Sequence, residues 1–92
     1  MVILVFAFDP AKSAANKAKH GMDFGEAQSL WNDTRLLVVP AKTTDEMRWA
    51  AFGLLAGKHW AAFFTWRGEI IRLISVHRAR TEEIAIYEGS NP

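Results

Sequence analysis

The chain has 92 residues, enough for one domain with a single hydrophobic core. Half of them are hydrophobic, 23% are charged and the net charge is +1, which excludes a disordered tail and a membrane protein. The absence of cysteine excludes a disulfide framework, a thiolate zinc site and a cysteine nucleophile, and it fits a reducing compartment. We therefore expect residues 1–92 to form one domain in the cytoplasm.

The positive charge is concentrated in two blocks of the chain. Residues 1–20 sum to +2 and residues 58–80 to +4, whereas residues 21–57 and 81–92 sum to −2 and −3. If folding brings the two basic blocks together, they form a patch that attracts phosphate groups. Solvated cations on unrelated surfaces would give the same totals, so charge alone leaves both interpretations open.

The first 21 residues predict a strand and then a helix. Val2–Phe8 is rich in β-branched and aromatic residues and predicts a buried first strand. This stretch has no basic leader and is too short to cross a bilayer, so we expect neither a signal peptide nor a membrane span. Asp9 can cap the free amides of a helix and Pro10 suits its first position, while Gly21 suits its end.

Two neighbouring faces of this helix differ in character. Four alanines at spacings of three and four form a slim face that we expect to pack against a sheet: Ala11, Ala14, Ala15 and Ala18. The adjoining stripe is polar and cationic: Lys12, Asn16, Lys19 and His20. Lys17 points further away from both.

The middle of the chain predicts a second helix and a short strand. Asp23 to Trp31 reads as a helix in which Asp23 and Glu26 form a capping box. Residues 35–39 predict a strand closed by Pro40, and residues 41–46 a polar connection.

The last half predicts a meander and a closing helix. Residues 47–55, 58–66 and 69–78 are strand-length apolar runs, separated by turns at residues 56–57 and 67–68. Thr81 can cap a final helix over residues 82–87, whose Ile84 and Tyr87 should dock on the sheet. The order β-α-α-β-β-β-β-α therefore predicts a two-layer α+β fold, with helices packed on one face of an antiparallel sheet.

Alternation along the predicted strands assigns side chains to the two faces of that sheet. One side of the last strand should carry Ile70, Arg72, Ile74, Val76 and Arg78, and the other Ile71, Leu73, Ser75 and His77. In the preceding strand one side carries Trp60, Ala62, Phe64 and Trp66. With a single helical layer we expect part of this aromatic surface to be open to a partner, the alternative being a stripe of core aromatics.

Motif searches leave cations as the candidate functional groups. No phosphate-binding glycine loop, nucleophile elbow or H-E-x-x-H is present, and the histidines are not spaced as a metal cage. The acidic pairs at 45–46 and 82–83 read as solvated charges and helix-start acids. Arg72, inside I-I-R-L-I-S, needs a carboxylate or a ligand phosphate, and Glu46 is the candidate structural partner.

Several segments together resemble the BrnT family, the ribonuclease toxins of type II toxin-antitoxin systems. The most specific is the run D-P-x-K-x-x-x-N-x-x-K-H-G-x-x-F-x-E-A, at residues 9–27. The segments "DEMR", "IIRLIS" and "EIAIYE" extend the likeness over nearly the whole chain. Two positions depart from the family pattern, because His77 and Ile84 stand where the family has arginines.

The resemblance implies a RelE-like fold and a metal-independent endoribonuclease, with no cofactor, that stops translation. It further implies an RNA substrate, no membrane association and neutralisation by a BrnA-type antitoxin with a ribbon-helix-helix domain. A homodimer and a toxin-antitoxin heterotetramer are both compatible with it.

On this hypothesis a ribose 2′-hydroxyl attacks the adjacent phosphate, which requires a base, an acid and cations. The expected catalytic residues are His20, Arg72, His77 and Arg78, and the expected RNA-binding residues are Lys12, Asn16, Lys19, Arg48 and Arg80. Arg72 and His77 point to opposite faces of a regular strand, so a shared site requires a bulge, a twist or a strand end. Two alternatives use the same fold, a noncatalytic RNA-binding module and a protein-interaction module, and His77 and Ile84 favour the former.

Overall fold

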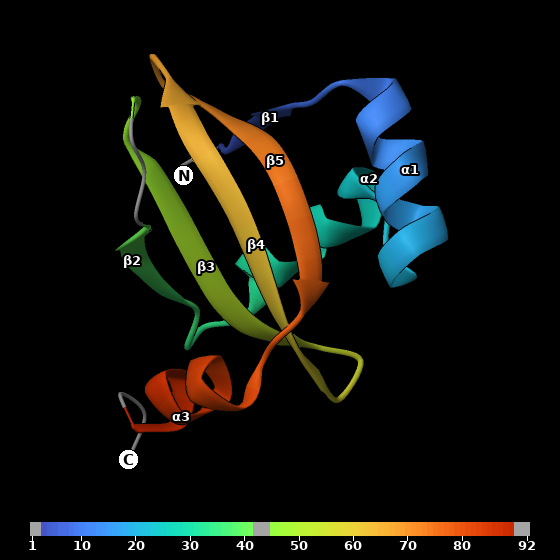
Figure 1. The fold of residues 1–92 in the computed structure, drawn as a ribbon. Coiled ribbons are helices and arrows are strands. Elements are labelled where there is room, and N and C mark those ends of the chain that lie inside the picture. The colour runs from blue at the N-terminus through green and yellow to red at the C-terminus, as the bar shows by residue number, and fades with distance from the viewer. Residues whose placement is uncertain (1–2, 42–44, 90–92) are drawn as a thin grey trace.

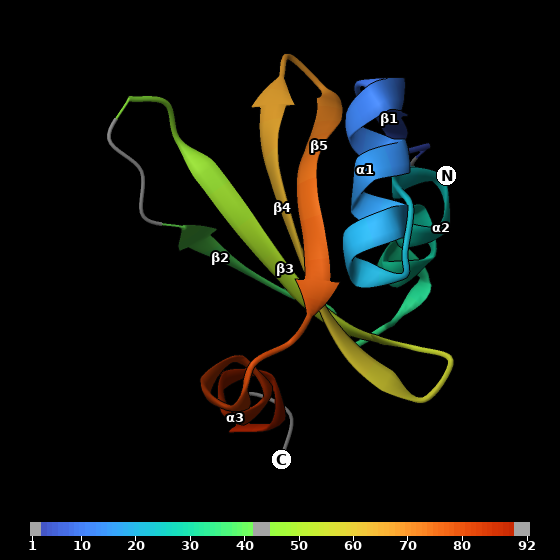
Figure 2. The ribbon, with the colours of Figure 1, turned by 45° about the vertical axis from the view of Figure 1, so that its right-hand side comes forward.

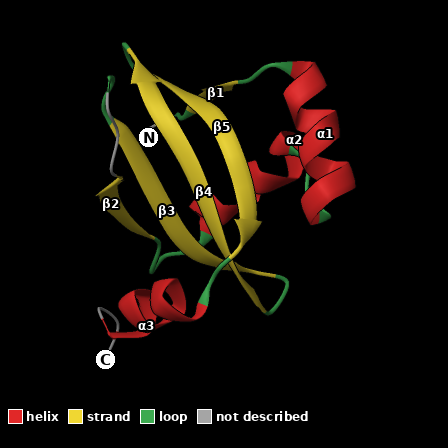
Figure 3. Ribbon diagram, in the orientation of Figure 1, coloured by secondary structure: helices red, strands yellow, loops and turns green. Residues whose placement is uncertain are grey.

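A computed structural model describes residues 3–41 and 45–89. These residues form one sheet of five strands, with three α-helices and a 3-10 helix around it (Figures 1 and 3). The strand order is β1-β5-β4-β3-β2, and every neighbouring pair is antiparallel except β1, which lies parallel to β5. The predicted α+β fold and its element order are confirmed, with one parallel pair added.

The first half of the chain folds through local caps. It contains β1 (Val5–Ala7), α1 (Pro10–His20), α2 (Phe24–Ala27) and the 3-10 helix η1 (Gln28–Asn32). The Asp9 carboxylate accepts from the first amides of α1, and Gly21 ends the helix at φ 82°. Asp23 and Glu26 form the capping box of α2. All of these predicted caps are confirmed.

The second half forms β2 (Leu37–Ala41), β3 (Arg48–Leu55), β4 (Lys58–Arg67), β5 (Ile70–Arg78) and α3 (Thr81–Gly89). Pro40 lies inside β2 instead of closing it, which is tolerated because β2 is an edge strand. The Thr81 cap is wrong: α3 begins at Thr81, and the Glu83 carboxylate accepts from the Arg80 amide.

Two further predictions concern the start of the chain and the connection after β2. The predicted strand includes Val2, and the connection includes residues 42–44, all of which lie outside the described residues. The expected burial of the first strand is wrong for Val5, which is 52% exposed. β1 is an edge strand, so one side of it has no neighbour.

The two faces of the sheet are occupied differently. α2 and η1 pack on one face, which we call the covered face, and α3 lies on the other, the open face (Figure 2). The core of the covered face joins helix and strand residues: Phe24, Ala27, Leu30, Ala62, Phe64, Ile71, Leu73 and Val76. A smaller cluster under Tyr87 of α3 fills one end of the open face. Most of the molecule's apolar packing is therefore on the covered face.

The aromatic stripe of β4 belongs to this core. Trp60, Ala62 and Phe64 are buried, so the expectation that the stripe is open to a partner is wrong for them. Trp66, at the end of the strand, is 46% exposed.

The prediction that α1 packs against the sheet through its alanines is wrong, because all four alanines are exposed. Its buried residues are Ser13 and Asn16. β1 pairs with β5 only as far as Arg72, and α1 lies beside the edge of β5 that follows. There the Asn16 amide donates to the Val76 carbonyl at 2.8 Å and accepts from the Val76 amide at 3.2 Å. Backbone groups at this edge require partners, and a polar residue provides them where alanine cannot.

A β-bulge in β5 decides which residues reach the open face. Phe63 of β4 pairs with Ser75 and Phe64 pairs with Leu73, so one extra residue is inserted in β5. The insertion reverses the alternation and places Val76 with Leu73 on the covered face. The strict alternation predicted for this strand is therefore wrong beyond Leu73. As a result Arg72, Ser75 and His77 share the open face.

Candidate active site on the open face of the sheet

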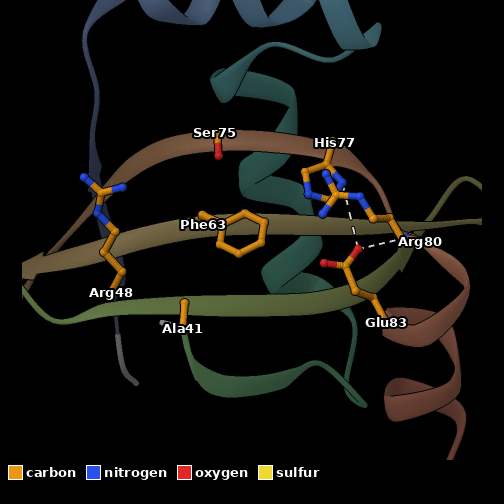
Figure 4. A pocket seen from close by; sticks show the side chains of 7 residues that line it. All are labelled: Ala41, Arg48, Phe63, Ser75, His77, Arg80 and Glu83. Atoms are coloured by element: carbon orange, nitrogen blue, oxygen red, sulfur yellow. Dashed lines mark hydrogen bonds and ion pairs between the residues drawn. The ribbon is translucent and has the colours of Figure 1, made fainter. Parts of the chain in front are cut away.

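The open face carries a hollow of about 520 Å³ (Figure 4). Strands β2 to β5 and the start of α3 supply its lining residues: Ala41, Arg48, Phe63, Ser75, His77, Arg80 and Glu83. Figure 4 shows the ring of Phe63 in the middle, Arg48 toward one end, and His77 and Arg80 toward the other. The predicted residues Arg48, His77 and Arg80 are thus brought together by the fold.

His77 is held in a defined orientation. Its ring stacks on Phe63 with the centroids 5.4 Å apart and the planes inclined by 30°. Nδ1 lies 2.7 Å from the backbone oxygen of Arg78. Because a carbonyl oxygen can only accept, Nδ1 carries the hydrogen of this bond, and Nε2 is the nitrogen able to exchange a proton with a ligand.

His20 approaches the same place from the end of α1. Its ring centroid is 6.1 Å from that of His77. Partial burial lowers the pKa of His20, and the positive charges of Lys19, His77 and Arg80 lower it further. His20 is therefore predominantly neutral at pH 7, in the form that accepts a proton.

Glu83 is the carboxylate of the hollow, and it is only 9% exposed. One of its oxygens accepts from the Arg80 amide at 2.8 Å and lies 3.9 Å from Nδ1 of His77. The prediction of a helix-start acid is confirmed, but its place in the hollow was missed. The available signal was its place at the start of the segment "EIAIYE", which contributes to the family resemblance.

Three guanidinium groups lie on the open face, and among the described residues none of them has a carboxylate partner. Within residues 3–41 and 45–89, no ion pair is found for Arg48, Arg72 or Arg80. The predicted pairing of Arg72 with Glu46 is wrong, because Glu46 pairs with Arg67 at 3.7 Å. Arg72 is half-buried beside Thr65 and does not line the hollow itself. A partly desolvated guanidinium favours a bound anion in this position.

The other predicted site residues lie apart from the hollow. Arg78 is on the covered face, with its guanidinium 5.6 Å from the centre of the Trp60 ring. Asn16 is buried, and its amide also donates to the Met22 carbonyl at 2.8 Å. Lys12 and Lys19 are exposed on α1, next to Asn16 around the helix and on the side away from Ser13. They therefore flank the edge of β5.

Contacts at the far end of α3 hold this helix in place. The Tyr87 hydroxyl donates to Asp33 at 2.8 Å, and burial together with this bond raises the pKa of Tyr87 to about 12. His59 lies 2.7 Å from Glu88. Glu83, in the first turn of the same helix, and Arg80, directly before it, are thereby positioned against the sheet.

This arrangement defines a small α+β protein whose open sheet face is suited to a phosphate-bearing ligand. A family model described as the ribonuclease toxin BrnT of type II toxin-antitoxin systems matches residues 8–83. The chain belongs to this family, as its motifs predicted. No curated protein matches the sequence closely enough to be named as a relative.

Two searches of the described residues bear on other classes of site. No helix within residues 3–41 and 45–89 has the length and apolarity to span a bilayer. The same residues contain no group of three His, Cys, Asp or Glu side chains arranged to hold a metal ion.

Proposed function

We propose that this chain is an endoribonuclease that cleaves RNA without a metal ion or cofactor and so inhibits translation. The observation that carries the proposal is a group of guanidinium groups that form no ion pair among the described residues, on the same face as His77: Arg48, Arg72 and Arg80. An RNA phosphate supplies the missing negative charge. The bulge in β5 supports the proposal, because it removes the objection that Arg72 and His77 point to opposite faces.

The reaction is a transfer of the phosphorus atom from one ribose oxygen to another. A bond forms between the 2′-oxygen and phosphorus while the bond to the 5′-oxygen breaks, leaving a 2′,3′-cyclic phosphate and a 5′-hydroxyl. Neutral His20 takes the proton of the 2′-hydroxyl, and Nε2 of protonated His77 gives a proton to the leaving oxygen. Arginines stabilise the negative charge that develops on the phosphate oxygens.

The remaining predicted residues take supporting roles. Arg72 holds the reacting phosphate, and Arg48 and Arg80 hold the RNA backbone at the two ends of the hollow. Lys12 and Lys19 hold the backbone that continues past the edge of β5. Arg78 and Asn16 are left out of the centre, because one faces Trp60 and the other is bonded to Val76.

Cleavage of end-labelled RNA in EDTA tests the proposal. The wild-type protein should leave cyclic phosphate ends, and Arg72→Ala should slow cleavage about 10²–10³-fold. Arg78→Ala, an arginine on the opposite face of the same strand, is the matched control and should retain most of the rate. Equal losses in the two variants would contradict the assignment of the open face.

A second function is favoured by one observation, the histidine and isoleucine at positions 77 and 84 where the family has arginines. A noncatalytic RNA-binding module would retain intact RNA in a salt-sensitive manner and release no fragments. The same labelled RNA in EDTA separates it from the enzyme.

We further propose that residues 1–92 act as one toxin domain in the cytoplasm, neutralised by a BrnA-type antitoxin with a ribbon-helix-helix domain. The family supports an antitoxin partner in general terms. An adjacent reading frame for such a protein, and recovery of growth on coexpression, would test this pairing.

A further inference from the structure

We propose that the hollow binds an unpaired nucleobase of RNA, stacked on Phe63, so that single-stranded RNA is the preferred form of the ligand. The inference rests on the proposed function, since it names the substrate form taken by the same site. It assigns a role to Phe63, Ser75 and Glu83, which the cleavage reaction does not use.

Phe63 has the placement of a stacking platform. Its ring lies in the middle of the hollow with a face toward the viewer of Figure 4, between the arginines at the two ends. The ring is held by stacking on His77 and by packing against the cluster of Ala50, Phe52, Ala61 and Tyr87. A fixed aromatic ring binds a base with little loss of conformational freedom, and stacking accepts every base because each has a π-face.

The charge of the lining favours a base over a second phosphate at the Glu83 side. A carboxylate repels phosphate, but it accepts hydrogen bonds from the N–H groups on the edge of a base. One oxygen of Glu83 is bonded to the Arg80 amide, and Figure 4 shows the other pointing toward Phe63. The Ser75 hydroxyl adds a second polar group across the ring. The hollow thus has cations at its ends for the backbone and an aromatic and polar centre for a base.

A base within a duplex cannot use this site. Its two faces are covered by neighbouring bases and its edge by the opposite strand, so it must leave the helix to reach Phe63. Single-stranded RNA avoids this cost.

Anisotropy with uncleavable oligonucleotides tests the proposal. The probe is a labelled 2′-O-methyl RNA decamer, which lacks the nucleophile, compared with its duplex and with an abasic strand of equal charge. The intact single strand should bind on the order of tenfold to a hundredfold more tightly than either. Phe63→Leu should remove this preference, and Phe63→Tyr should keep it. Trp66→Leu changes an exposed aromatic residue on the other face of β4 and should bind as the wild type does.

Failure of this inference is distinct from failure of the proposed function. Equal binding of the intact and abasic strands by the wild-type protein overturns the base site, whatever the folding of the variants. Equal binding of the single strand and the duplex does the same, and so does an unchanged preference in folded Phe63→Leu. Cleavage of RNA in EDTA would still uphold the nuclease in each of these cases. A base preference without any cleavage would uphold the base site and overturn the nuclease.

Discussion

Phe63 and Phe64 are consecutive residues of β4, yet they belong to the two different faces of the sheet. Phe64 is 1% exposed and meets the Trp31 ring edge-on at 5.5 Å, beneath the helical layer. Phe63 is half-buried, stacks on His77 and borders the hollow. One helical layer thus supplies most of the core, which leaves the open face available for charged groups that a ligand can meet.

The same contrast continues in β5, where the bulge determines its chemistry. Without the extra residue, His77 would face the helices and Val76 would face solvent. With it, Val76 is fully buried and His77 meets Phe63. A bulge in this position re-aims a side chain next to a site, as bulges beside active sites commonly do.

The largest expected effect on stability comes from replacing each of the two phenylalanines with alanine and comparing the variants. Phe64→Ala should lower the free energy of unfolding by about 3–5 kcal/mol, because it removes a fully buried ring and leaves a cavity. Phe63→Ala should lower it by about 1 kcal/mol, since its ring is partly solvated. Urea unfolding of both variants measures the difference. Similar losses would show that the open face contributes as much to stability as the covered face.

Asn16 marks the boundary between the two faces, at the edge of β5. Asn16→Ala leaves Val76 and Met22 with unpaired backbone groups and should lower the free energy of unfolding by about 2–3 kcal/mol. Lys12→Ala, on the same helix but exposed, should change it by less than about 0.5 kcal/mol. Hydrogen exchange at the Val76 amide gives an independent measurement, since this amide should exchange faster only in the first variant.

Features fixed by neighbours in the sequence could be predicted, and those fixed by distant partners could not. Asp9, Gly21 and the Asp23–Glu26 box cap helices through residues two to four positions away. Asn16 forms hydrogen bonds to a residue 60 positions away in the chain. The sequence does not show this partner, so the prediction placed the polar side chain of Asn16 on a solvent-facing stripe and the alanines in the interior.

The candidate site shows the same division. Its cations could be identified from the sequence, because the motif searches left them as the candidate functional groups. Their grouping depends on an extra residue in β5 whose signature is not local, so Arg78 was paired with Arg72 although the bulge separates them. Phe63 and Glu83 were missed since each also has an ordinary structural role, as a strand aromatic and as a helix-start acid.

Asp33, which accepts a hydrogen bond from Tyr87 of α3, should make the stability of the protein depend on pH in acid. Burial acts to raise the pKa of Asp33, but hydrogen bonds from the Leu54 and Arg35 amides and from Tyr87 outweigh it and lower the pKa. The contribution of ionised Asp33 to the free energy of unfolding is therefore complete above the pKa of the unfolded chain, about 3.9. It is lost as the pH falls through the lower pKa of the folded protein. Urea midpoints should drop in acid for the wild type.

Asp33→Asn tests this dependence. It should lower stability at pH 7 by about 1–2 kcal/mol, because an amide nitrogen cannot accept the bonds that the carboxylate accepts. The fall in acid should become shallower in this variant. Glu69→Gln, in the exposed turn after β4, should match the wild type at both pH values, including its full fall in acid. A fall that is as shallow in Glu69→Gln as in Asp33→Asn would assign the acid sensitivity to general charge.

The smallest expected effect concerns the one imidazole that reaches the open face from α1. Lys19 contributes to the low pKa of His20, so Lys19→Gln should raise that pKa toward its ordinary value of about 6.5. Lys17→Gln is the matched control, since Lys17 is paired with Glu26 at 2.7 Å and does not act on His20. Titration of the imidazole resonances by NMR measures both variants.

The same pair of variants connects this titration to cleavage. If neutral His20 is the base, the acid limb of the rate against pH should move to higher pH in Lys19→Gln by the amount that the imidazole resonance moves. In Lys17→Gln neither should move. A shifted resonance with an unmoved acid limb would show that a group other than His20 takes the proton from the 2′-hydroxyl. His77, which lines the hollow, would then be the first residue to test.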